Sequence, residues 1–156
     1  MNGVSAPALK VAVQSEDFDP GVLQRDLLKG TCDEGAIASF TGYVRRANVG
    51  RQLLAMELEH YPGMTERSIQ TIVEEAARRW PVLGATVLHR IGPLAPGDQI
   101  VWVGVASAHR EAAFDACEFI MDYLKTRAPF WKREIHEGGA SWVEARTSDE
   151  ERASRW

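Results

Sequence analysis

The sequence predicts a single α+β domain in which mostly antiparallel strand pairs alternate with three helices. A length of 156 residues with 45% hydrophobic content suits one core. Segments with strand-like alternation are interrupted by segments with helical spacing, and only short turns separate the strands of a pair. We expect this domain over residues 1–146, followed by a polar, loosely ordered tail over residues 147–156.

The first strand is predicted over residues 9–14 and the first helix over residues 20–28. Asp19 is a typical N-cap residue, Pro20 suits the first helical turn, and Gly30 follows the end of the helix. These signals define the start and stop of the helix from local chemistry alone.

Two strands follow over residues 36–44 and 53–60, and the second alternates regularly between apolar and polar side chains. Residues 45–52 form a polar link with three arginines. Gly42 lies inside the first of these strands, which indicates a bulge or the close approach of another group.

A second helix is predicted over residues 64–80 from its apolar spacing, and Pro81 ends it. Strands resume over residues 85–91 and 99–107, joined by a Pro-Gly-Asp turn over residues 96–98.

The third helix is predicted over residues 110–125, with an apolar stripe along one side. Pro129 cannot continue this helix, so the chain must bend before the next strand. A last hairpin is expected over residues 130–136 and 141–145, with its turn at residues 138–139.

The segment KTRAPFWKRE, residues 125–134, is the first candidate functional site. The chain has four lysines against fourteen arginines, yet Lys125 and Lys132 both lie in this segment. A lysine crowded by other cations in an apolar setting can lose its proton, which suits acid/base or nucleophilic chemistry. The alternative is a solvated basic helix end that interacts favourably with the helix dipole. The scarcity of lysine elsewhere favours a function.

Two further cationic clusters are candidates. His109 and Arg110 follow a predicted strand and open a helix, where free backbone N–H groups favour a phosphate or carboxylate. The alternative is that Ser107 caps the helix and both side chains are solvated. Residues 40–46 end a strand and lead into the arginine-rich link. Because surface arginines are common, an anion site at residues 40–46 is weak evidence unless it converges on the other two clusters, and we expect all three to converge on one cavity.

Composition and spacing exclude several classes of protein. A net charge of -4 and a pI of about 5.6 argue against general nucleic-acid or membrane-surface binding. Cys32 and Cys117 form no metal or disulfide pattern, and the histidines lack ligand spacing. There is no nucleotide-binding glycine motif, no signal peptide pattern and no apolar run long enough to span a bilayer. We therefore expect a cytoplasmic protein.

The three segments FTGYVR (40–45), SAHR (107–110) and MDYLKTRAPFWKRE (121–134) resemble the family of catalytic, large subunits of molybdopterin synthase. The resemblance extends through EHYPGMTE (59–66), HRIGPLAPGD (89–98) and WVEAR (142–146), and so covers nearly the whole chain. It implies an α/β-hammerhead-like fold. It also implies an enzyme that inserts two sulfurs into cyclic pyranopterin monophosphate to form the dithiolene of molybdopterin.

The resemblance further implies the partners. The sulfur donor is a separate small, ubiquitin-like subunit with a C-terminal Gly-Gly thiocarboxylate, and two large subunits form the central homodimer of a heterotetramer. No cofactor, metal, nucleic acid or membrane is implied.

The resemblance also assigns roles to residues. It implies Lys125 and Lys132 as catalytic residues and Phe40 and Met121 as walls of a channel. The implied substrate-binding residues are Tyr43, Val44, Arg45, His109, Arg110, Arg133 and Glu134. Tyr43 departs from the family pattern, which has lysine at this position.

Two other functions are compatible with the residues. A single-stranded nucleic-acid binder could stack bases on Phe130 and Trp131 beside the basic side chains, although the net acidity argues against it. A dimeric scaffold could dock a ubiquitin-like partner without chemistry, and substitution of Lys125 would then leave product formation unchanged.

Overall fold

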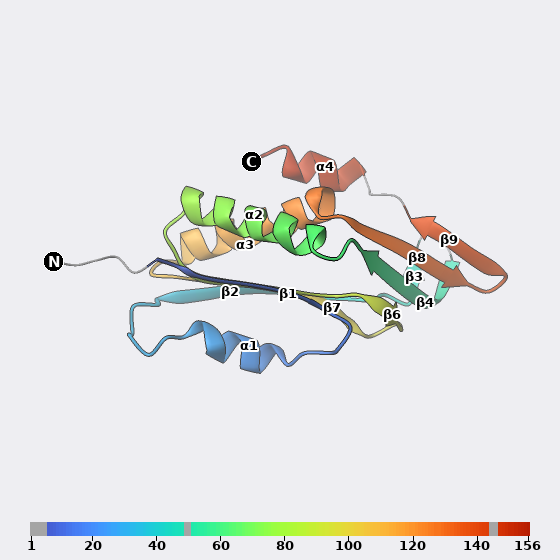
Figure 1. The fold of residues 1–156 in the computed structure, drawn as a ribbon, viewed down its shortest axis with the longest axis horizontal. Helices are drawn as coiled ribbons and strands as arrows, with labels where there is room; N and C mark the ends of the chain where they lie inside the picture. The colour runs from blue at the N-terminus through green and yellow to red at the C-terminus, as the bar shows by residue number, and fades with distance from the viewer. Residues whose placement is uncertain (1–5, 49–50, 144–146) are drawn as a thin grey trace.

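The computed structural model describes residues 6–48, 51–143 and 147–156 (Figure 1). Within these residues the chain forms two β-sheets and four helices. The strands are β1 (Ala8–Gln14), β2 (Ala36–Tyr43), β3 (Ala47–Asn48), β4 (Arg51–His60), β5 (Val82–Arg90), β6 (Gly92–Leu94), β7 (Gln99–Ser107), β8 (Phe130–His136) and β9 (Gly139–Val143). The helices are α1 (Pro20–Leu27), α2 (Met64–Arg79), α3 (Arg110–Arg127) and α4 (Thr147–Ala153).

The first sheet has the strand order β1-β5-β7-β2, in which β1 pairs in parallel with β5 and the other pairs are antiparallel. Helices α2 and α3 cover one face and α1 covers the other (Figure 1). Alternation along β7 supplies both cores, since Val103 and Val105 pack under α2 and α3 while Trp102 packs under α1. The predicted α+β class with mostly antiparallel pairing is confirmed.

The second sheet lies beyond one end of the first and has the order β3-β4-β8-β9, with β6 also paired to β4 (Figure 1). Its pairs are antiparallel among the described residues. A separate small core forms where β4 meets the end of β2, from Val44, Leu53, Met56, Leu58 and Leu94. This core lies directly beneath the candidate site.

Most predicted elements agree with the structure to within a few residues. The bulge expected at Gly42 is present, because the β2–β7 register shifts between Gly42 and Tyr43. A Cβ at Gly42 would lie 2.8 Å from the Val101 side chain, so the position also needs glycine for space. The short strands β3 and β6 were not predicted, and both are too brief to show alternation. The end of the predicted last strand, residues 144–145, lies outside the described residues.

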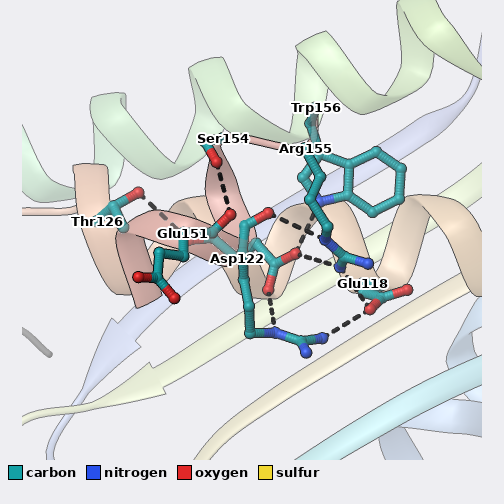
Figure 2. Close-up of polar contacts among 8 residues, drawn as sticks. Glu118, Asp122, Thr126, Glu151, Ser154, Arg155 and Trp156 are labelled. Atoms are coloured by element: carbon teal, nitrogen blue, oxygen red, sulfur yellow. Dashed lines mark hydrogen bonds and ion pairs between the residues drawn. The ribbon is translucent and has the colours of Figure 1, made fainter. Parts of the chain in front are cut away.

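The predicted number of three helices and the predicted loose tail are wrong. Residues 147–153 form α4, which lies against α3 (Figure 1). Asp122 of α3, only 5% exposed, accepts hydrogen bonds from Arg152 (3.2 Å), Arg155 (3.1 Å) and the Trp156 indole (2.7 Å), and Figure 2 shows this network. The tail is ordered by charge pairing and one aromatic ring, which a search for apolar stripes does not detect.

Candidate active site

Lys125 and Lys132 line the same cavity, of about 440 Å³, where the end of α3 meets the second sheet. We call it the lysine cavity. Helix α3 ends at Arg127, and the extended backbone of Ala128 (φ -80°, ψ 130°) leads into β8. Pro129 therefore produces the predicted bend, which returns Lys132 toward the last turn of α3.

Alternation along β8 divides its charged residues between two faces. Lys132 and Glu134 line the lysine cavity, and Glu134 is buried. Arg133 lies between them and faces the other way, where its guanidinium is 3.8 Å from the Glu57 carboxylate. Arg133 is not among the residues that line the lysine cavity.

The end of β2 forms another wall of the lysine cavity, through Tyr43, Val44 and Arg45. The Val44 N–H donates to Asp98 O (2.9 Å), and the Val44 carbonyl accepts from Gly97 N–H (2.8 Å). Both backbone groups of Val44 are thus used by the turn that connects β6 and β7. This anchoring directs Arg45 toward the two lysines.

Phe40 and Met121 line a second cavity, of about 630 Å³, which we call the Met121 cavity. Lys125 and Asp149 line both cavities, so the two spaces meet at the Lys125 side chain. Asp149 belongs to α4, and the predicted loose tail in fact contributes a carboxylate to this junction.

His109 and Arg110 lie at the opposite end of α3 from Lys125. Sixteen residues of helix separate His109 from Lys125, which is about 24 Å at 1.5 Å per residue. Both side chains are exposed. His109 is the N-cap and makes no side-chain capping bond, while Ser107 donates to Pro81 O at 2.9 Å. Within one chain, the expected convergence of three cationic clusters is therefore wrong, and two of them converge.

His89 is a wall residue of the lysine cavity that sequence reasoning did not select. Its ring stacks on Phe130, with centroids 3.9 Å apart. Burial, with a smaller contribution from the nearby charge of Lys125, lowers the pKa of His89 to about 4. In the sequence, His89 stands out only as part of the HRIGPLAPGD segment of the family resemblance, because its proximity to Lys125 depends on tertiary packing.

The described residues contain no cluster of three or more His, Cys, Asp or Glu that could hold a metal ion. Burial raises the pKa of the Cys117 thiol to about 12, with a smaller effect from Glu118, so this thiol stays protonated. Among the described helices, none is both long enough and apolar enough to cross a membrane.

Comparison with known proteins identifies the family. Residues 13–127 match the family model described as MoaE protein. A molybdopterin synthase catalytic subunit from Pseudomonas aeruginosa is 55% identical over 148 residues, which cover 95% of this chain and 99% of the relative. The chain belongs to the MoaE family. Its Escherichia coli relative, also a molybdopterin synthase catalytic subunit, is 57% identical over 152 residues, or 94% of this chain and 97% of the relative.

Solved structures of MoaE proteins have the same fold. The protein from Burkholderia ambifaria matches with a TM-score of 0.82 at 46% identity, over 95% of this chain and 97% of that one. A molybdopterin synthase chain from Staphylococcus aureus matches with a TM-score of 0.80 at 31% identity, over 85% and 96%. The MoaE family comprises molybdopterin synthase catalytic subunits, so this chain is a sulfurtransferase subunit of molybdenum cofactor biosynthesis, as its motifs predicted.

Proposed function

We propose that the lysine cavity is where sulfur passes from the thiocarboxylate of a small, ubiquitin-like subunit to cyclic pyranopterin monophosphate. Two such transfers form the dithiolene of molybdopterin. The observation that carries this proposal is the meeting of Lys125 and Lys132, from a helix and a strand, in one cavity of about 440 Å³. That volume is in the range of small-molecule sites.

The charges of the lysine cavity suit both reactants. A cyclic phosphate and a thiocarboxylate are anions, and the described residues that line the cavity include the basic side chains of Arg45, Lys125 and Lys132. Ammonium and guanidinium groups fixed in position stabilise negative charge without reorganising during the reaction. Glu134, buried beside Lys132 on the same strand face, would orient the cations. We assign Lys125 and Lys132 as the catalytic residues.

The Met121 cavity suits the extended C-terminus of the small subunit. Phe40 is exposed and Met121 is partly buried, so the walls offer apolar contact to a chain end that carries no large side chains. A Gly-Gly terminus entering along this cavity would reach Lys125, the residue shared with the lysine cavity. One chain of a solved Helicobacter pylori complex of subunits 1 and 2 of molybdopterin-converting factor has the same fold, with a TM-score of 0.69 at 18% identity over 88% of this chain and 91% of that one.

His109 and Arg110 fit this proposal only in a homodimer. They lie too far along α3 to reach a ligand in the lysine cavity of their own chain. Being exposed, they can complete the cavity of a partner protomer and supply further cationic contacts to the phosphate. A homodimer with one small subunit for each cavity accounts for both clusters. We place this assembly in the cytoplasm.

Reconstitution tests the proposed function. The purified chain is mixed with cyclic pyranopterin monophosphate and a ubiquitin-like partner that ends in a thiocarboxylate, and the dithiolene product is measured. We expect product with this partner and none when the same partner ends in an ordinary carboxylate. Absence of product from both mixtures would contradict the proposal.

A further inference from the structure

His89 supplies the lysine cavity with an imidazole ring, beside basic, acidic and hydroxyl groups on its other polar walls. It lies near the end of β5, opposite Val101 of β7 and Val13 of β1. Its imidazole stacks on Phe130, the first residue of β8, with an angle of 20° between the rings. The stack thus joins the first sheet to the second at the cavity.

Hydrogen bonding fixes the orientation of this imidazole. Nδ1 lies 2.8 Å from the Arg90 carbonyl oxygen, so the ring proton is on Nδ1 and donates to that oxygen. The peptide group that follows Arg90 is held on its other side, because Ile91 N–H donates to Gln14 O at 2.9 Å. The Arg90 guanidinium is fixed as well, donating to the carbonyl oxygens of Ser15 and Gln99. These contacts hold the Arg90 carbonyl oxygen in place as the acceptor of the hydrogen bond from Nδ1–H.

The second ring nitrogen is left as an acceptor that opens on the cavity. Among the described residues, every buried side-chain nitrogen and oxygen has a hydrogen-bond partner. Within that same part of the chain, His89 makes its hydrogen bond through Nδ1 alone. An Nε2 atom without a partner would appear as a buried unsatisfied nitrogen if it were enclosed in the core, so it is accessible to solvent. Because His89 lines the lysine cavity, we take this cavity as the space that Nε2 faces.

The imidazole is neutral at physiological pH, since burial and the charge of Lys125 lower its pKa to about 4. Among the described residues, the other ionisable side chains of the cavity wall are the Tyr43 hydroxyl, three basic groups and two carboxyl groups: Arg45, Lys125, Lys132, Glu134 and Asp149. Cations cannot accept hydrogen bonds, and a carboxylate that accepts them brings negative charge toward an anionic ligand. A neutral acceptor avoids that repulsion.

We propose that His89 is a ligand-recognition residue whose Nε2 accepts a hydrogen bond from a ring N–H or amino group of the bound pterin. This inference rests on the proposed function, because a pterin carries such donors at its edge and inorganic phosphate does not. A buried donor without a partner is costly, so the acceptor selects a pterin over a simple phosphate. Arg45, Lys125 and Lys132 would bind the phosphate group and the thiocarboxylate of the sulfur donor.

Calorimetric binding without the small subunit tests the inference, since no turnover is then possible. Cyclic pyranopterin monophosphate and inorganic phosphate are titrated into wild type, His89→Phe and His89→Gln. Phenylalanine keeps the stack and removes Nε2, whereas the amide oxygen of glutamine can reach the place of Nε2. We expect His89→Phe to weaken pyranopterin binding roughly 10- to 100-fold and to leave phosphate binding unchanged. His89→Gln should recover most of the loss.

A matched control is His136→Phe, which changes a histidine on β8 that lines neither the lysine cavity nor the Met121 cavity. If His89→Phe does not fold, the test is made on the wild-type protein by recording ¹⁵N NMR spectra of its imidazole nitrogens. Addition of cyclic pyranopterin monophosphate should then shift the Nε2 resonance of His89 more than its Nδ1 resonance. Equal affinities for wild type and His89→Phe, or an unmoved Nε2, would overturn this inference alone. No binding of the pyranopterin by wild type would overturn the proposed function together with it.

Discussion

At the scale of single residues, side-chain direction decides which of the clustered cations can act together. The sequence concentrates Lys125, Lys132 and Arg133 in ten residues, and this density correctly indicated a shared cavity for the lysines. The density of cations could not show that Arg133 points away from the lysine cavity, because that direction is set by the alternation of side chains along β8. His89 was missed because its contact with Phe130 joins residues far apart in the sequence.

Because Lys132 and Arg133 lie on opposite faces of β8, their alanine variants form a matched pair. Lys132→Ala removes a cation from the lysine cavity, and we expect kcat/KM for dithiolene formation to fall roughly 10- to 100-fold, as for a lost charge-assisted hydrogen bond. Arg133→Ala removes a neighbouring cation that pairs with Glu57 on the exposed face. Its effect should be less than about fivefold, typical of a surface ion pair. Steady-state kinetics would refute the assignment if both variants lost activity equally.

The lowered pKa of His89 predicts a pH dependence of stability. The folded chain takes up the proton near pH 4 and the unfolded chain near pH 6.5, so the unfolded state binds more protons between these values. The free energy of unfolding should therefore fall as the pH falls from 6.5 to 4, by at most roughly 3 kcal/mol from this group. The other charged side chains that line the cavity beside the ring are Arg45, Lys125 and Lys132 and the carboxyl groups of Glu134 and Asp149.

Urea unfolding of wild type and His89→Gln over this pH range isolates the contribution of His89, because the carboxylates are common to both. Wild type should lose more stability than His89→Gln on acidification. Parallel pH profiles would show that the imidazole does not titrate as described.

At the scale of elements, helix boundaries were predictable because local chemistry sets them. Asp19 accepts a hydrogen bond from Gly21 N–H (2.8 Å) as the N-cap of α1, and Pro129 follows the end of α3. Helix α4 was not predictable, because its order depends on Asp122, more than twenty residues away in the sequence. An element held by long-range ion pairs gives no periodic signal of its own.

Trp156 should be the main anchor of the segment that contains α4. Its ring packs edge-on against Trp80 (5.4 Å) and Phe119 (5.9 Å), and its indole N–H donates to Asp122. Trp156→Ala should lower the free energy of unfolding by about 2–3 kcal/mol through the loss of two aromatic contacts and a hydrogen bond to a carboxylate. Trp142→Ala, at an exposed ring of β9, serves as the control for urea unfolding and should change stability little. Equal destabilisation by the two substitutions would contradict this role.

At the scale of the whole molecule, the lysine cavity exists because two sheets meet beside the end of α3. The α+β class followed from the order of elements, but the pairing of β4 with β8 joins residues that lie between 70 (His60 and Phe130) and 83 (Leu53 and His136) positions apart, and it had no local signal. The same architecture places His109 and Arg110 at the far end of α3. The sequence indicated three cationic clusters, and it could not show that one of them lies at the opposite end of α3 from the other two.

Subunit mixing tests whether the distant pair completes the cavity of a partner protomer. Lys125→Ala and Arg110→Ala chains should each be nearly inactive alone. In mixed homodimers, one of the two cavities regains both residues, so random exchange should restore up to about a quarter of wild-type activity. If Arg110 acted within its own chain, every mixed cavity would keep one defect and no activity would return. Full activity of Arg110→Ala alone would also contradict the shared site.

The most direct measurement is the rate of dithiolene formation by Lys125→Ala with the thiocarboxylated small subunit and cyclic pyranopterin monophosphate. Lys10→Ala, on the exposed side of β1, is the matched control. We expect a rate about 10²- to 10⁴-fold below wild type for Lys125→Ala, with an unchanged circular dichroism spectrum, and a wild-type rate for Lys10→Ala. A wild-type rate for Lys125→Ala would contradict the assignment of sulfur transfer to the lysine cavity.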